Sequence, residues 1–196
     1  MQYLKLIFIS PVLKFKTVRL LAILTITAII LPSTLYAGTP SQTSLADGNW
    51  KIDTSGSRYI RMVVNGNVTW GDRLMFAFDK SNCTEAEVLM YFSSYEKEVV
   101  NFKDHKILLN FGNAEISSKI LSVYDFLLPH RIATIRVGFI EKDSLLRWEK
   151  LKDVISISIS KNNPKLLQDA FDMKFNEYST VGLTKALSRI EKVCEK

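Results

Sequence analysis

Acid–base chemistry in this chain would depend on its two histidines, His105 and His130. With Asp104 beside His105, or with Asp72 or Asp125, either imidazole could in principle complete a Ser–His–Asp hydrolytic triad. The Gly-x-Ser-x-Gly turn that presents the nucleophile in many hydrolases does not occur in the sequence. We therefore expect a surface histidine in a polar loop at 105, a turn histidine at 130, and no catalytic residue.

Metal and cofactor chemistry has equally little support. Zinc sites use three or four cysteine, histidine or carboxylate ligands, and neither Cys83 nor Cys194 has a partner at ligand spacing. The neighbouring carboxylates at 85 and 87, and at 96 and 98, are typical of solvated strand or loop positions. The eight glycines are scattered singly, so no phosphate-binding loop is formed. The sequence predicts no metal and no cofactor.

The first 37 residues have the order of a secretory signal peptide. Four basic residues and no acidic residue precede or border an uncharged, mostly apolar run at 20–31, and Ala37 supplies a small residue for cleavage. A spanning helix needs about 20 apolar residues, so this run is short for a stable anchor. We expect cleavage after Ala37 and a periplasmic or secreted protein. An uncleaved segment, the alternative, would be the chain's only link to a membrane.

Removing that segment changes the meaning of the chain's charge. The whole chain has 26 basic and 20 acidic residues, and removing the four basic residues of the segment leaves 22 against 20. The segment 58–61, Arg-Tyr-Ile-Arg, interleaves basic and aromatic residues as single-strand binders do. Because the exported domain is nearly neutral, we interpret 58–61 as an ordinary strand and expect no nucleic-acid partner.

Two cysteines in an exported chain are typically paired, so the sequence predicts a disulfide between Cys83 and Cys194. Closing a loop of about 110 residues corresponds to about 4–5 kcal/mol in the chain-entropy model. Two separate buried thiols remain the alternative, because Cys194 lies on the apolar face of its expected helix.

Short strands dominate the expected secondary structure. Period-two or continuous apolar runs predict strands at 50–55, 59–64, 68–70, 74–78, 88–95, 106–111, 116–127, 132–140, 154–160 and 171–176. Asn65-Gly66 predicts a tight hairpin turn into the strand at 68–70. A short helix, capped by Asp143 or Ser144, is expected to end at Lys152.

A second, amphipathic helix closes the chain at 180–196. Leu183, Leu187, Ile190 and Cys194 are spaced to share one of its faces. Without regular strand–helix alternation, the expected fold is mainly β: an antiparallel β-sandwich or open barrel with this helix packed against it. We expect a signal peptide at 1–37, a flexible leader at 38–49 and one β-rich domain at 50–196.

The closing segment, which contains Phe175, Ser-Thr-Val-Gly-Leu-Thr-Lys-Ala-Leu at 179–187, and Cys194, resembles the end of invasion-associated locus B-type periplasmic proteins. In that family a last strand passes through a glycine turn into a helix that carries alanine and leucine. The resemblance covers about twenty residues. It implies a periplasmic β-sandwich without a known catalytic site.

These observations favour a non-enzymatic exported domain that binds another envelope or secreted protein, as an accessory, secretion-associated factor or inhibitor. The alternative is a binder of a small apolar or glycan ligand. Its ligand-facing aromatics would be Trp50, Trp70 and Trp148, which are otherwise expected as core or rim residues. An exported hydrolase is the third and weakest hypothesis.

Overall fold

The computed structural model describes residues 45–69, 71–127 and 129–194. The expected signal peptide at 1–37 and most of the expected leader therefore lie outside the described residues. Within them, ten strands form one antiparallel sheet in the order β1-β2-β3-β4-β5-β8-β7-β6-β9-β10. No helix of the described ranges is long and apolar enough to cross a membrane.

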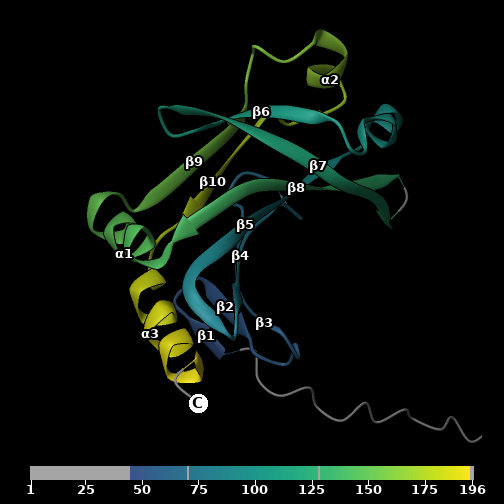
Figure 1. Ribbon diagram of the computed structural model, residues 1–196. Helices are drawn as coiled ribbons and strands as arrows, with labels where there is room; N and C mark the ends of the chain where they lie inside the picture. The colour runs from purple at the N-terminus through teal and green to yellow at the C-terminus, as the bar shows by residue number, and fades with distance from the viewer. Residues whose placement is uncertain (1–44, 70, 128, 195–196) are drawn as a thin grey trace, which may run out of the picture. The chain divides into compact units, whose positions relative to one another are not determined.

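The strands and helices follow one another along the chain as shown in Figure 1. The strands are β1 (Leu45–Asp47), β2 (Trp50–Asp53), β3 (Tyr59–Asn65), β4 (Arg73–Asp79), β5 (Asn82–Ser94), β6 (Lys106–Phe111), β7 (Ala114–Leu127), β8 (His130–Glu141), β9 (Val154–Ile159) and β10 (Phe175–Ser179). The helices are η1 (Lys97–Phe102), α1 (Lys142–Leu151), α2 (Lys165–Asp169) and α3 (Leu183–Cys194).

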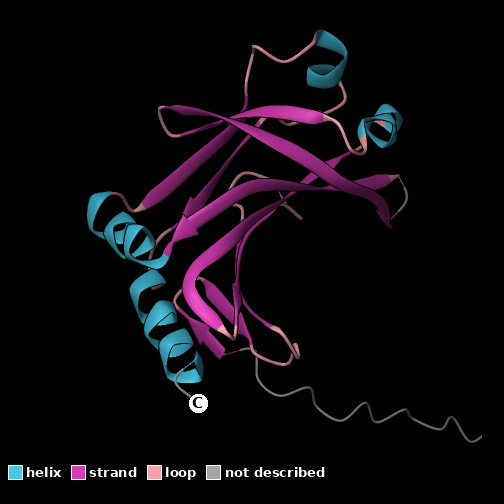
Figure 2. Ribbon diagram, in the orientation of Figure 1, coloured by secondary structure: helices cyan, strands magenta, loops and turns pink. Residues whose placement is uncertain are grey.

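The sheet curls into a half-barrel, and the helices lie at its margins (Figure 2). An isolated antiparallel bridge between Gly66 and Tyr178 brings the end of β3 against β10, so the two sides of the curled sheet meet there. The mainly antiparallel β fold with a C-terminal helix is confirmed, whereas a division into two packed sheets, as in a sandwich, is not.

Alternating burial explains why the clearest sequence patterns predicted strands correctly. In β9 all three isoleucines are buried, while Ser156 is exposed and Ser158 half-buried. In β5 both faces are apolar, and the strand lies in the middle of the sheet between β4 and β8. The core is one continuous cluster that includes side chains from the sheet and from α1, α2 and α3.

The predicted hairpin at Asn65-Gly66 is wrong. Asn65 pairs with Arg73, so the returning strand is β4, and residues 66–69 and 71–72 belong to the longer connection between the two strands. Gly66 does not have the positive φ that a type I′ turn requires. It is needed for a different reason: a Cβ atom at this position would overlap the side chain of Asn176 on β10. Close approach between segments distant in sequence selects this glycine.

The last strand also differs from the prediction. We expected it at 171–176, but β10 runs from Phe175 to Ser179, and the preceding segment contains the short helix α2. Phe171 is a core residue that packs edge-to-face against Phe92, with ring centroids 6.1 Å apart. Of the alternating apolar residues at 171, 173 and 175, only Phe171 is in the core; Met173 is half-buried and Phe175 is exposed at the start of β10.

Two element boundaries need smaller corrections. The expected leader contains β1, which pairs with β2, so the ordered domain begins before Trp50. The internal helix α1 begins at Lys142 after Glu141, and neither Asp143 nor Ser144 caps it.

The closing helix α3 packs as its apolar stripe predicted. Leu183, Leu187 and Ile190 are fully buried, and so is Ala186 beside them. Glu149 of α1 accepts hydrogen bonds from the backbone N–H groups of Gly182 (3.0 Å) and Thr184 (2.6 Å) at the start of α3. Although burial alone would raise the pKa of Glu149, these hydrogen bonds hold it below its ordinary value.

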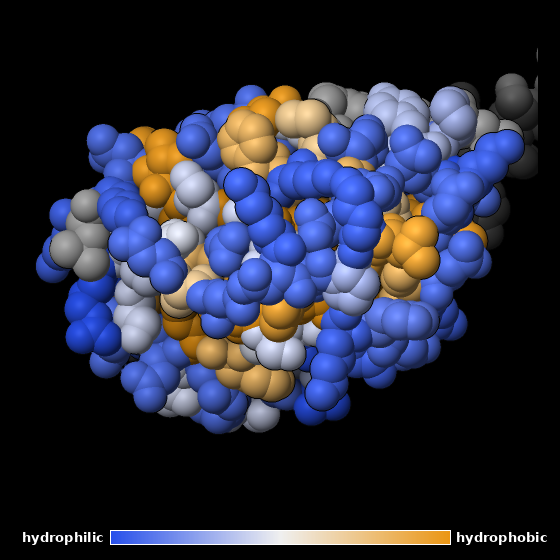
Figure 3. All heavy atoms as spheres, turned by 90° about the horizontal axis from the view of Figure 1, so that it is seen from above, coloured by the Kyte–Doolittle hydropathy of each residue, from blue (hydrophilic) through white to orange (hydrophobic). Residues whose placement is uncertain are grey.

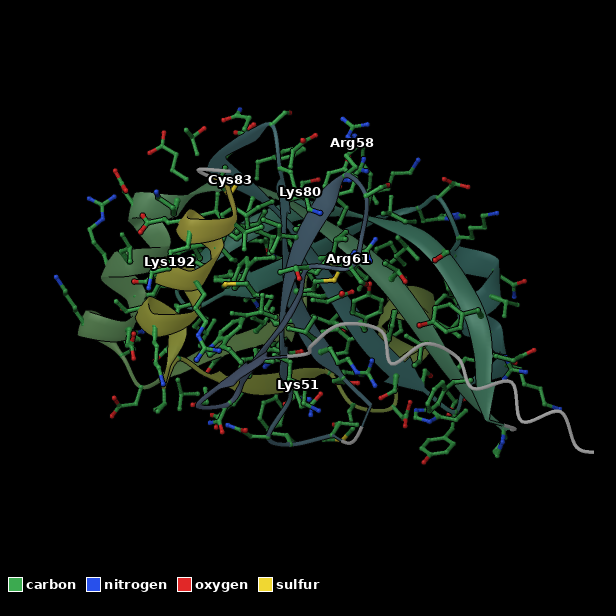
Figure 4. All side chains as sticks on the ribbon, turned by 90° about the horizontal axis from the view of Figure 1, so that it is seen from below. Lys51, Arg58, Arg61, Lys80, Cys83 and Lys192 are labelled. Carbon is green, nitrogen blue, oxygen red and sulfur yellow. A yellow bond between two sulfur atoms is a disulfide. The ribbon has the colours of Figure 1, made fainter. Side chains whose placement is uncertain are left out.

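The other end of α3 is fixed by the predicted disulfide. Cys194 is bonded to Cys83, at the start of β5, and their Cα atoms are 6.2 Å apart. Figure 4 shows Cys83 beside this end of the helix, while Lys192 lies on an outward face. The same view shows Lys51, Arg58, Arg61 and Lys80 around β2, β3 and β4. The alternative of two separate thiols is not supported, because both cysteines are in the bond.

Candidate functional site

The structure describes two of the three tryptophans that we considered as ligand-facing, and their environments differ. Trp50 is fully buried and stacks on Phe76 with ring centroids 5.5 Å apart, so it is a core residue and cannot contact a ligand. Trp70 lies outside the described residues. Trp148 is half-buried on α1 and lines two pockets at the surface.

We call these two adjoining pockets the Trp148 groove. The first has a volume of about 270 Å³ and lies between α1, the β6–β7 turn and the start of β9. The second has a volume of about 150 Å³ and lies between β7 and the end of β8. Phe111 and Trp148 line both, and their ring centroids are 5.2 Å apart. Phe111 and Trp148 therefore form an aromatic wall that the two pockets share.

Core packing and two glycines shape this groove. Trp148 rests edge-on against the buried ring of Phe76, with centroids 6.0 Å apart, which holds the indole on the core. Gly112, with φ of 60°, makes the tight β6–β7 turn that follows Phe111. Gly138 on β8 pairs with Val88 of β5, and the position of its missing Cβ is open space. The second pocket is thus partly the volume of an absent side chain.

The groove combines an apolar body with a few polar groups. Asn113, Lys152 and Ser156 line the first pocket, and Phe139 lines the second. Phe139 is 67 % exposed and is the most exposed aromatic side chain in the described part of the chain. In the view of Figure 3, apolar side chains lie in small groups among hydrophilic ones. The groove therefore suits an apolar side chain or ring with a polar group at one end.

A buried polar network lies where β10 meets the β3–β4 loop, away from the residues of the groove. The backbone N–H of Ser93 (2.7 Å) and its hydroxyl both donate to Asp72 Oδ1, and Asn176 Nδ2 donates to Asp72 Oδ2 (2.9 Å). Asn176 Oδ1 accepts from the N–H of Val68 (3.0 Å) and of Glu177 (2.8 Å). Each amide and carboxylate oxygen of this pair therefore has a defined partner.

Burial raises the pKa of Asp72 above its ordinary value, against hydrogen bonds from Ser93 and Asn176 that lower it. Burial, and then the charge of Asp72, raises the pKa of Tyr178 well above its ordinary value. The Tyr178 hydroxyl is buried without a hydrogen-bond partner in the described part of the chain. No local pattern in the sequence indicated this network, because Ser93 lies 21 positions and Asn176 lies 104 positions after Asp72.

The residues of the hypothetical triad do not assemble as one. The Ser93 hydroxyl donates to Asp72, and both residues are buried, so this serine is not presented to a substrate. Asp104 forms an ion pair with Lys119 (2.9 Å), and Asp125 forms one with Arg131 (3.1 Å). The other carboxylates we considered are therefore engaged in surface ion pairs.

The two histidines have different environments. His105 is exposed, as expected, and its Nδ1 lies 3.1 Å from the carbonyl oxygen of Lys103. The expectation of a turn position for His130 is wrong, because it begins β8 and is only 6 % exposed. Its ring stacks on Tyr95 (centroids 4.9 Å apart) and meets Phe126 edge-on (6.1 Å). These two aromatic contacts contribute to its burial.

We expect Asp72→Asn to lower the free energy of unfolding at pH 7 by about 1–3 kcal/mol, as typical for an unsatisfied buried donor. The new amide N–H₂ would face the N–H₂ of Asn176, and one of these buried donors would lose its acceptor. Adding Asn176→Asp restores the pairing with its polarity reversed, so the double variant should recover most of the loss. Urea denaturation measures both, and a double variant no more stable than Asp72→Asn would contradict this network.

The wild type and the single variant Asp72→Asn together test the pKa of Asp72. A carboxyl whose pKa is raised on folding makes the native state less stable as pH rises from its unfolded value, near 3.8, through its folded value. The variant lacks this carboxyl and should lack this dependence. The stability difference between wild type and Asp72→Asn should therefore grow as pH falls through that window, and a constant difference would contradict the raised pKa.

Metal binding gains no support from the arrangement of ligands. Across the described ranges, no group of three or more histidine, cysteine or acidic residues is placed to hold a metal ion.

Comparison with protein-family models, with curated proteins and with solved structures finds no match to this chain. The assignment of the candidate site therefore rests on its geometry alone.

Proposed function

We propose that this chain is an exported, non-enzymatic domain that binds another envelope or secreted protein through the Trp148 groove. The observation that carries the proposal is the pair of pockets that share Phe111 and Trp148. Aromatic side chains that are held by the core and open to the surface are typical anchors for partner side chains. Phe139 at the rim offers further apolar area to a partner.

Export is part of this proposal and rests on the sequence of residues 1–37. Cleavage after Ala37 would leave a mature chain that begins at Gly38. The Cys83–Cys194 disulfide is consistent with an oxidising compartment. The intact mass of protein from the exported fraction checks the cleavage position, and the full-length chain embedded in membrane would contradict it. The likeness of the C-terminal segment to invasion-associated locus B-type proteins agrees with this location and remains a proposal.

A small apolar or glycan ligand is the second candidate for the same groove. The first pocket, of about 270 Å³, would hold a ring-sized group, and Asn113, Lys152 and Ser156 could orient its polar end. Of the three tryptophans, this alternative now depends on Trp148, because Trp50 is buried in the core.

Site-specific photo-crosslinking in the native host would separate these candidates. We would place p-benzoylphenylalanine at position 139, on the rim of the groove, and at position 175, where another exposed phenylalanine lies on β10. Phe139 is 67 % exposed and Phe175 is 44 % exposed, so both exchanges leave the core intact. We expect a discrete protein adduct from position 139 and none from position 175.

The contrary outcomes are equally defined. A protein adduct only from position 175 would move the binding site away from the groove. Absence of any protein adduct, together with a small bound mass in native mass spectrometry that disappears in Trp148→Leu, would favour the small-ligand alternative. Absence of both would reject the groove as a binding site.

A further inference from the structure

Two neighbouring strands of the sheet separate beside the Trp148 groove. The β7–β8 ladder ends at the pair Lys119–Arg136. Beyond it, residues 114–118 pair only with β6, residues 138–141 pair only with β5, and Val137 is paired with neither neighbouring strand. Figure 1 shows β7 and β8 diverging toward the side of α1. We call the region between these two segments the β7–β8 wedge.

The wedge contains the second pocket of the groove. Ile116 of β7, and Val137, Gly138 and Phe139 of β8, line this space of about 150 Å³ together with Phe111 and Trp148. Around Gly138 the register against β5 shifts at Val88/Leu89, so Val137 is an extra residue on β8. The bulge bends β8 away from β7, and the missing side chain of Gly138 leaves room behind it.

An open strand edge beside an apolar pocket is an arrangement that can bind an extended peptide. Each unpaired edge presents backbone N–H and C=O groups in the row that a further strand would use. Peptide recognition by strand addition takes affinity from these main-chain bonds and specificity from pockets for alternate side chains. The wedge supplies both, along five residues of β8, which corresponds to roughly 17 Å of extended chain.

Uncompensated negative charge lies at the open end of the wedge. Glu141, the last residue of β8, stands directly opposite Glu85 of β5, and Asp143 lines the same surface pocket. Like charges that face one another across a ladder are destabilising. The lysine of this pocket, Lys142, is engaged elsewhere, because its Nζ lies 2.7 Å from Glu191 Oε1. Within the described residues, Glu85, Glu141 and Asp143 form no ion pair.

We propose that the free edge of β8 accepts an extended segment of the partner protein as an additional strand. The segment carries apolar side chains at alternate positions, one of them in the pocket beside Gly138 and Trp148. A lysine or arginine of the segment lies against Glu85, Glu141 and Asp143. This inference rests on the proposed function and specifies the chemistry of its partner.

The test uses the mature, disulfide-bonded chain and twelve-residue peptides selected on it from a randomised displayed library. We expect the selected peptides to alternate apolar and polar residues and to carry lysine or arginine near one end. Hydrogen exchange in the complex should slow at the amides of residues 137–141 and stay unchanged at 175–179 of β10. Methylation of alternate peptide nitrogens should weaken binding at least about tenfold, because it removes strand hydrogen bonds and keeps every side chain.

Variants of the protein complete the test. Phe139→Ala should weaken the peptide at least about tenfold, as for an interface anchor, whereas Phe175→Ala should change affinity less than about twofold. Glu141→Gln should weaken binding and flatten its dependence on salt concentration. Selection of no peptide, full affinity after N-methylation, or protection outside residues 114–118 and 137–141 would overturn the strand-addition proposal. A protein adduct from position 139 would still stand in each of these cases, so the proposed function and this inference fail separately.

Discussion

Replacing both Cys83 and Cys194 by serine is expected to lower the free energy of unfolding by about 2–5 kcal/mol. The bond joins residues 111 positions apart and fixes the last turn of α3 to the start of β5. Without it, the unfolded chain gains conformational freedom, and the C-terminal end of α3 loses its only covalent tie to the sheet. For a domain of this size the loss corresponds to a decrease of roughly 4–20 °C in the thermal midpoint.

Thermal and urea unfolding with and without reductant would measure this effect. The reduced wild type should unfold at the same midpoint as the double serine variant, and the variant should not respond to reductant. Hydrogen exchange should rise first at the C-terminal turn of α3. An oxidised wild type with the stability of the variant would contradict a stabilising bond, and two alkylatable thiols in native exported protein would contradict the bond itself.

The second large effect is expected from Leu187→Ala, at about 2–5 kcal/mol. Leu187 is fully buried at the centre of the α3 stripe, between Leu183 and Ile190. The substitution removes apolar contacts and leaves a cavity under the helix, because the disulfide at one end and the Glu149 cap at the other limit how far α3 can move to fill it. Partner binding should fall only as far as the folded fraction falls, since the groove contains no α3 residue.

Ser188 provides a matched control on the neighbouring, exposed face of the same helix. Its hydroxyl donates to the carbonyl oxygen of Thr184 (3.1 Å), a local contact that an alanine can lose without leaving a cavity. Ser188→Ala should therefore change stability by less than about 0.5 kcal/mol. Equal effects of the two substitutions, measured by urea denaturation, would show that α3 does not bury Leu187.

Within the candidate site, the sequence could name a residue but not its role. Residue type alone does not distinguish Trp50, Trp70 and Trp148, because a tryptophan can face either the core or the surface. Trp50 is fully buried and stacks on Phe76, whereas Trp148 meets Phe76 edge-on and stays half-buried beside Phe111. Which tryptophan stays accessible depends on elements far apart in the chain, so local pattern cannot decide it.

Features that depend on near neighbours in the chain could be predicted from the sequence. The alternation of isoleucine and serine in β9 and the apolar face of α3 each predicted which side of the element is buried, and the structure confirms both. The continuous apolar run in β5 likewise agrees with a strand that is apolar on both faces. The pairing of the only two cysteines also followed from the sequence, because there was one possible bond.

Features that depend on distant partners emerged only in the folded chain. Gly66 looked like half of a tight turn, but its role is to let β3 meet Asn176 on β10. Asp72 was considered as a triad carboxylate, but its two oxygens accept hydrogen bonds from Ser93 and Asn176 inside the fold. The wedge likewise exists because β7 and β8 stop pairing at Lys119–Arg136, and strand order and ladder length are set by long-range contacts that a local period does not encode.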